Sequence, residues 1–235
     1  MRRRPRSSTR DPSAPLESFF KEPLEHLPRW VDALPLLMTG ILMLLWTWGT
    51  WPDPVIDFGA QLYFAWQLAE GKVLYADLAH YKGPLSPYMN ALWFQFFGTS
   101  LRTLMLANLV ITAVLVWLLY RLFSTIAGRF SATVSCLVFI MVFAFGQLVG
   151  IGNYNFVCPY SHEVTHGLVL SLAMIGSLAR GLYHRHRNAL VGAGVLFGLV
   201  FLTDPAVFLA AGSAAATGLV LSAWVERDPP HRRAL

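Results

Sequence analysis

The chain has 235 residues, of which 55% are hydrophobic and only 13% are charged, and its mean hydropathy is +0.50. This composition excludes an ordinary soluble domain and predicts an all-α, polytopic membrane protein. The net charge of +5 does not indicate nucleic-acid binding, because the basic residues lie at the amino terminus and in short gaps between apolar runs. The two cysteines, Cys136 and Cys158, are too few and too differently placed for a disulfide framework or a cysteine zinc site.

The first 30 residues are rich in arginine, proline and serine, and they lack the apolar core and small-residue cleavage site of a secretory signal. We expect a basic cytoplasmic tail that ends in an interfacial segment. Residues 31–226 are then the membrane domain, and residues 227–235 are a second cytoplasmic tail.

Crossing the hydrocarbon core as a helix takes about 20 apolar residues. Six segments come close to this length: 32–51, 101–123, 131–150, 164–182, 189–203 and 205–225. The fifth is short, and LTDPAV (202–207) separates it from the sixth, so the last two could instead form one broken element. We predict about six transmembrane helices.

The arginines indicate which ends of these helices face the cytoplasm. With the amino terminus inside, the inner gaps contain Arg121, Arg129 and the run RGLYHRHRN (180–188). The outer side then receives loops 52–100 and 151–163 and the break at Asp204, which together hold most of the acidic residues of the membrane domain. This pattern predicts a multi-pass protein of an inner or plasma membrane with its polar clusters on the outer face.

The first outer loop, 52–100, is long for a simple connection, and long loops are often functional. Within it, DFGAQLYFAWQLAEG (57–71) and YMNALWFQFFG (88–98) mix polar and aromatic residues as helices in the membrane interface do. Gly71 and YKGPLSP (81–87) supply turn residues between them. We predict two interfacial helices in this loop.

The order of motifs in this loop resembles the first outer loop of GT-C superfamily glycosyltransferases. These polytopic enzymes, which include protein mannosyltransferases and aminoarabinose transferases, take sugars from polyprenyl-phosphate donors. The motifs are Asp57, Tyr63, GKVLY (71–75), YKGPL (81–85) and NALWFQFFG (90–98). Two further segments, NYNFVCPYSHEVTHG (153–167) and GLVFLTDPAVFLAA (198–211), also resemble related sequences. Those have TKPE where this chain has TDPA, a departure that removes a lysine able to contact the donor phosphate.

The resemblance implies transfer of a sugar from a polyprenyl-phosphate donor to an acceptor on the outer face of the membrane. Asp57 matches the superfamily's acid and is the candidate general base, although an aspartate there could simply cap a helix. Lys82, Lys72 and His80 are candidate phosphate contacts, with a non-functional reading favoured for Lys72. No cofactor is certain, and a divalent metal could share the work. The full set of candidate substrate-binding residues is Tyr63, His80, Tyr81, Lys82, Asn153, Tyr154, His162, Glu163 and Asp204.

The resemblance covers an amino-terminal part of such enzymes, which usually have more spans than this chain. A truncated or inactive relative, or one that pairs with a missing carboxy-terminal half or a second subunit, is therefore an alternative. The competing class is a non-catalytic membrane module that binds a polyprenyl lipid or another subunit.

A rival motif is HEVTH (162–166), which satisfies the H-E-x-x-H pattern of zinc metalloproteases. It places His162 and His166 on one helical face as candidate metal ligands. The third ligand is missing from the local sequence, and only Asp57, Asp77 and Asp204 could supply one from the same side. We favour a structural hydrogen-bonded cluster over a protease and expect no histidine-dependent zinc.

Overall fold

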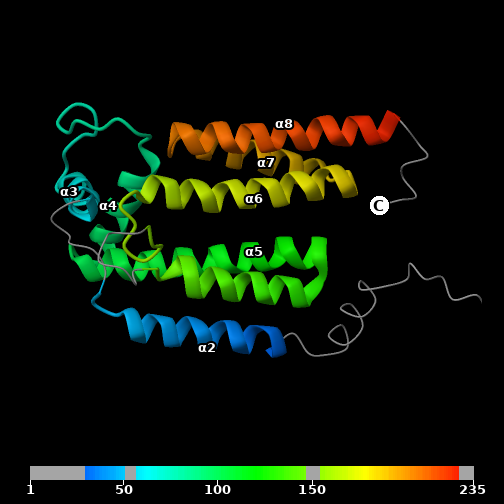
Figure 1. Ribbon diagram of the computed structural model, residues 1–235. Coiled ribbons are helices and arrows are strands. Elements are labelled where there is room, and N and C mark those ends of the chain that lie inside the picture. The colour runs from blue at the N-terminus through cyan, green and yellow to red at the C-terminus, as the bar shows by residue number, and fades with distance from the viewer. Residues whose placement is uncertain (1–29, 51–56, 147–153, 228–235) are drawn as a thin grey trace, which may run out of the picture.

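The computed structural model of the chain describes residues 30–50, 57–146 and 154–227. Within these ranges the protein is built from helices and has no strand, apart from one isolated bridge between Leu74 and Leu78. The prediction of an all-α fold is confirmed. Figure 1 shows long helices that run roughly side by side, with shorter helices and loops gathered at one end.

The first long helix, α2 (Trp30–Thr47), packs against the hairpin formed by α5 (Leu101–Val138). Ser100 caps the amino terminus of α5, because its hydroxyl accepts a hydrogen bond from the Thr103 amide at 3.1 Å. Gly128 then takes a left-handed φ of 80°, which a residue with a side chain rarely adopts, and it divides α5 into two arms.

The two arms of α5 lie side by side and antiparallel (Figure 1). The Cys136 thiol of the second arm donates to the Val116 carbonyl of the first at 3.6 Å, across the hairpin. The second arm continues as a π-helical segment, η1 (Phe139–Ala144). The predicted segments 101–123 and 131–150 therefore correspond to these two arms, although residues 147–150 lie outside the described ranges.

Three further helices form the other side of the bundle: α6 (His162–His184), α7 (Arg187–Phe201) and α8 (Pro205–Arg227). They share a core of Met174, Ala193, Val200 and Ala211. The predicted break at LTDPAV is present, because α7 ends at Phe201 and α8 starts at Pro205, whose ring disfavours helical geometry at the preceding residue.

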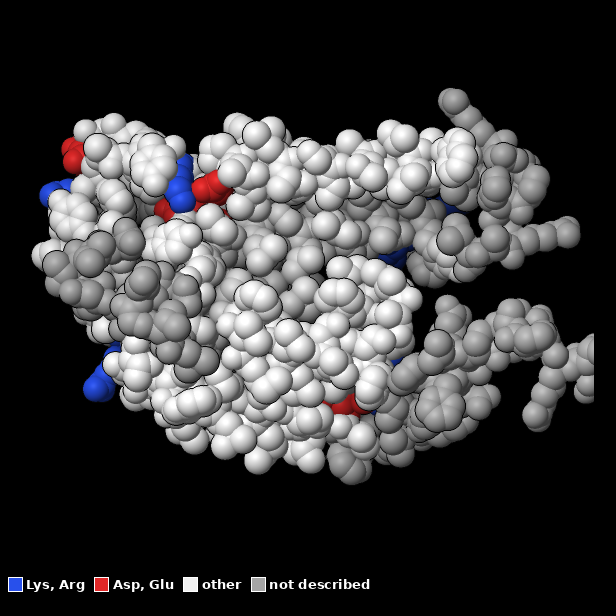
Figure 2. All heavy atoms as spheres, viewed as in Figure 1, with Lys and Arg blue, Asp and Glu red and all other residues white. Residues whose placement is uncertain are grey.

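Three helical stretches in the described residues are long and apolar enough to cross a membrane: Leu101–Ala144, which includes the Gly128 turn, His162–His184 and Pro205–Trp224. The 23 residues of α6 extend about 34 Å at 1.5 Å per residue, which exceeds the hydrocarbon core of a bilayer. Figure 2 shows charged side chains toward the two ends of the visible face and uncharged surface between them. These features fit a membrane protein.

The first outer loop forms two helices, α3 (Asp57–Ala69) and α4 (Leu85–Phe97), which pack on each other at one end of the bundle (Figure 1). Leu68, Leu74, Leu78 and Ala91 make a small core between the helices and the turn that joins them. Both helices were predicted from the sequence. Their position in the membrane interface stays a prediction.

Candidate functional site

The YKGPL turn between α3 and α4 is joined to the break between α7 and α8 by backbone hydrogen bonds. The Gly83 amide donates to the Thr203 carbonyl at 2.8 Å, and the Leu85 amide donates to the Leu202 carbonyl at 2.9 Å. A Cβ atom on residue 83 would lie 2.1 Å from the Leu202 carbonyl oxygen, so only glycine allows this approach. Two motifs about 120 residues apart, at 83 and 203, thus form one surface.

Lys82 connects this surface to the start of α6. Its Nζ atom donates to the Ser161 hydroxyl at 2.6 Å and lies 3.1 Å from the Asp204 carboxylate. The same atom is 3.8 Å from the Glu163 carboxylate, which is an electrostatic contact rather than a hydrogen bond. The Lys82 side chain is 16% exposed, so it lies at the edge of the cluster and is partly open to solvent.

Glu163 is the fully buried centre of the cluster. Its carboxylate accepts hydrogen bonds from the Ser161 hydroxyl at 2.9 Å and from the Gln61 amide of α3 at 3.2 Å. Burying a carboxylate is costly unless it is paired and hydrogen-bonded, and these donors, with the nearby Lys82 ammonium, meet that requirement. We call Gln61, His80, Lys82, Ser161, Glu163 and Asp204 the outer cluster.

His80 lies beside Glu163 but does not hydrogen-bond to it. Its Nε2 atom is 3.6 Å from the carboxylate and has no hydrogen-bond partner among the described residues. The ring packs edge-on against Phe64, with centroids 5.0 Å apart. Burial lowers the pKa of His80 below its ordinary value, although the Glu163 carboxylate opposes the shift in part. His80 is therefore a neutral, buried imidazole at neutral pH.

Asp204 has two structural roles. One carboxylate oxygen accepts from the Ala206 amide at 2.9 Å and so caps α8, while the other faces Lys82. Burial alone would raise the pKa of Asp204, but the hydrogen bonds from Lys82 and the Ala206 amide outweigh it and hold the pKa below its ordinary value. Asp204 therefore stays ionised and binds the ammonium group of Lys82.

His162 belongs to a second group of buried polar residues, together with Asn90 and Asn108. One ring nitrogen is 2.6 Å from the Asn90 amide of α4, and the other is 3.3 Å from the Asn108 amide of α5. Asn108 also donates to the Val157 carbonyl at 3.0 Å. Because both ring nitrogens have partners, His162 joins three helices and has no free nitrogen for a metal ion.

His166, one turn further along α6, differs from His162 in having one ring nitrogen without a partner. Its Nδ1 atom is 2.9 Å from the Ser86 hydroxyl, and its buried Nε2 atom makes no hydrogen bond within the described ranges. No group of three or more histidine, cysteine, aspartate or glutamate side chains among the described residues is arranged to hold a metal ion. The HEVTH motif is here part of a hydrogen-bonded cluster at the start of α6.

The remaining predicted site residues lie around or beyond the outer cluster. Tyr81 is exposed beside Lys82, with the ammonium 5.8 Å from its ring centroid. Tyr63 is exposed and contacts the Phe64 ring. The Tyr154 hydroxyl pairs with the Thr165 hydroxyl at 2.5 Å, and burial raises its pKa.

Two predicted residues are not characterised by the described atoms. Asp57 is the first residue of α3, one turn before Gln61, but its side chain is outside the described part of the chain. Asn153 also lies outside the described residues. The structure thus brings His80, Lys82, Glu163 and Asp204 together and leaves the proximity of Asp57 to them a prediction.

Five polar residues that contact Glu163, His162 or His166 were not predicted from the motifs: Gln61, Ser86, Asn90, Asn108 and Ser161. Asn108 carried a usable signal, since an amide in the middle of an apolar run has to find a partner inside the bundle. The others lie in mixed segments, where a polar residue is equally common on an exposed surface.

No protein-family model matches this chain, and neither a curated protein nor a solved structure is significantly similar to it.

Proposed function

We propose that this chain is a glycosyltransferase-like membrane protein that binds a polyprenyl-phosphate-linked sugar at its outer end and transfers the sugar to an acceptor. The observation that supports this most is the position of Lys82, where three outer segments meet. A lysine ammonium carries three hydrogens, and Ser161 and Asp204 engage two of them. The third remains available to a phosphate oxygen at the solvent-exposed edge.

The proposal includes a topology of six spans: α2, the two arms of α5, α6, α7 and α8. The amino terminus and the arginine-rich turns are cytoplasmic, and the outer cluster faces the opposite compartment. A reporter fused after Arg187 should therefore be active only in the cytoplasm, and one inserted near Ala79 only outside. Activity of both reporters on the same side would contradict the topology and the outer location of the site.

The proposed chemistry assigns one step to each of two residues. Asp57 takes the proton from the acceptor hydroxyl as its oxygen forms a new bond to the anomeric carbon of the sugar. The bond from that carbon to the donor phosphate breaks, and the electron pair leaves with the polyprenyl phosphate. Lys82 stabilises the negative charge that develops on the departing phosphate.

The test is sugar transfer by the purified chain in lipid vesicles, with labelled polyprenyl-phosphate hexoses and aminopentoses as donors. Asp57→Asn should lower the transfer rate by about 10²- to 10⁴-fold, the usual contribution of a general base. Its melting temperature should not change, because asparagine caps a helix about as well as aspartate. Glu70→Gln, in the same loop, is the control and should keep its activity. Full activity of Asp57→Asn would reject the base assignment.

A second candidate function is a non-catalytic module that binds a polyprenyl lipid. It is favoured by the engagement of both carboxylates of the outer cluster, since neither Glu163 nor Asp204 is free to act as a base. This module predicts binding of polyprenyl phosphate without transfer. In either case Lys82→Met should weaken that binding, whereas Lys72→Met, an exposed lysine of the same loop, should not.

A further inference from the structure

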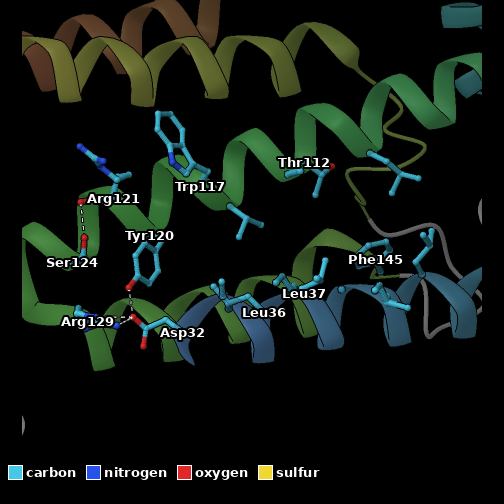
Figure 3. A pocket seen from close by; sticks show the side chains of 18 of the residues that line it. Asp32, Leu36, Leu37, Thr112, Trp117, Tyr120, Arg121, Ser124, Arg129 and Phe145 are labelled. Carbon is cyan, nitrogen blue, oxygen red and sulfur yellow. Dashed lines mark hydrogen bonds and ion pairs between the residues drawn. The ribbon is translucent and has the colours of Figure 1, made fainter. Parts of the chain in front are cut away.

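A second feature of the molecule is a groove between α2 and the first arm of α5, whose lining is completed by Arg129, Ile140 and Phe145 (Figure 3). It encloses about 860 Å³, a volume within the range of ligand-binding cavities. Its walls include Leu36 and Ile41 from α2 and Leu109 and Val116 from α5. Most of the groove is therefore apolar, and it is separate from the outer cluster.

One end of the groove is polar. Asp32 is buried there, accepts from the Tyr120 hydroxyl at 2.6 Å and pairs with the Arg129 guanidinium at 2.6 Å (Figure 3). This pair joins α2 to the residue that follows the Gly128 turn, and so it fixes the spacing of the groove walls at this end. It also neutralises the charge of Arg129.

Arg121 lines the same end of the groove, but unlike Arg129 its charge is not neutralised by Asp32. It is exposed, and its guanidinium lies 5.8 Å from the centre of the Trp117 ring. No carboxylate of the described residues pairs with it. Since Asp32 and Arg129 cancel each other, the described charged residues that line this end of the groove sum to one positive charge.

The dimensions of the groove match one half of a bilayer. Leu109 and Arg121 are twelve residues apart on α5, which corresponds to about 18 Å at 1.5 Å per residue. One leaflet of the hydrocarbon core is about 15 Å deep, half of the whole. An acyl chain whose headgroup lies at Arg121 would therefore extend along the apolar walls toward the middle of the protein.

We propose that this groove binds one anionic glycerophospholipid, with an acyl chain between α2 and α5 and its phosphate on the Arg121 guanidinium. Arginine binds phosphate through paired hydrogen bonds and so favours an anionic lipid headgroup over a zwitterionic one. The polar end lies at the end of the bundle away from α3 and α4 (Figure 1), which is the cytoplasmic end in the proposed topology. Anionic lipids of the cytoplasmic leaflet bind basic pockets between helices at this level.

Native mass spectrometry of the full chain in detergent tests this proposal. The protein is titrated separately with dioleoyl phosphatidylglycerol, dioleoyl phosphatidylcholine and undecaprenyl phosphate. We expect one tightly bound phosphatidylglycerol, with a clear preference over phosphatidylcholine. Arg121→Gln should reduce that preference about fivefold, the effect of one arginine near an anionic surface. Arg102→Gln, at the other end of the same helix, should not change it.

A second pair of variants tests the groove itself. Gly40 lines it, and a Cβ atom at this position would meet nothing within 4 Å, so Gly40→Leu should fill the groove without strain and abolish tight lipid binding. Gly194→Leu on α7, where a Cβ atom is equally unhindered, is the matched control and should bind as the unmodified chain does.

The proposal is overturned if the unmodified chain holds both phospholipids equally. It is also overturned if neither Arg121→Gln nor Gly40→Leu changes phosphatidylglycerol binding. Preferential binding of undecaprenyl phosphate in the groove would also overturn it, because the occupant would then be a polyprenyl lipid rather than a phospholipid. None of these outcomes depends on sugar transfer, so this proposal and the proposed function can fail independently.

Discussion

Replacement of Gly83 by alanine tests whether the YKGPL turn really lies against the α7–α8 break. The added methyl group would be 2.1 Å from the Leu202 carbonyl oxygen, whereas real Cβ contacts essentially never fall below 3.0 Å. The turn must therefore retreat by about 0.9 Å, the difference between these two distances. The clashing atoms are backbone atoms, so a change of side-chain rotamer cannot relieve the contact.

The retreat would break the hydrogen bond from the Gly83 amide to the Thr203 carbonyl and the one from Leu85 to Leu202. Each such bond contributes about 1 kcal/mol, and forced overpacking adds about 1–3 kcal/mol. With two such bonds lost, we expect Gly83→Ala to lower the free energy of unfolding by about 3–5 kcal/mol. For a chain of this size that corresponds to a loss of about 6–20 °C in melting temperature.

The assay is thermal unfolding in detergent, together with the rate at which an amine reagent labels Lys82. Detachment of the turn should speed this labelling, because the ammonium group would lose its contacts with Ser161 and Asp204. Gly176→Ala on α6 is the control: its site is open, so alanine should leave the melting temperature equal or slightly higher. An unchanged melting temperature and labelling rate in Gly83→Ala would refute the docked turn.

Two further predictions concern the outer cluster. In a double-mutant cycle, Lys82→Met and Asp204→Asn should show a coupling of about 1–3 kcal/mol in the free energy of unfolding, because both side chains are largely buried. A coupling near zero would mean that the ion pair does not form. Folding lowers the pKa of His80 below its ordinary value of 6.5. When the pH falls through 6.5, the unfolded state therefore binds a proton that the folded state does not yet bind, and the free energy of unfolding decreases. When the pH is lowered from about 7.5 to about 5.5, the melting temperature of the wild type should fall more than that of His80→Gln. His186→Gln, which changes an exposed histidine, is the control and should fall as much as the wild type does. An equal fall in all three proteins would contradict a buried, neutral His80.

The sequence alone determined where most of the helices lie. Apolar runs placed the long helices, Pro205 marked the break between α7 and α8, and the turn residues near Gly71 and YKGPL separated α3 from α4. These features are readable because hydrophobic periodicity, proline geometry and turn preferences act on neighbouring residues. The sequence also identified Lys82, Glu163 and Asp204 as unusual polar residues, since charges between apolar runs stand out.

Only the tertiary structure decided which of these residues are partners. Nothing in the local pattern showed that Lys82 reaches Asp204, or that His162 lies between the amides of Asn90 and Asn108. The reach of Gly83 to Leu202, and the groove in which Arg121 lies, likewise depend on how distant helices pack. Propensity and periodicity are properties of a few consecutive residues, whereas partners are chosen by packing across the bundle, where each buried polar group binds whichever group the fold brings to it.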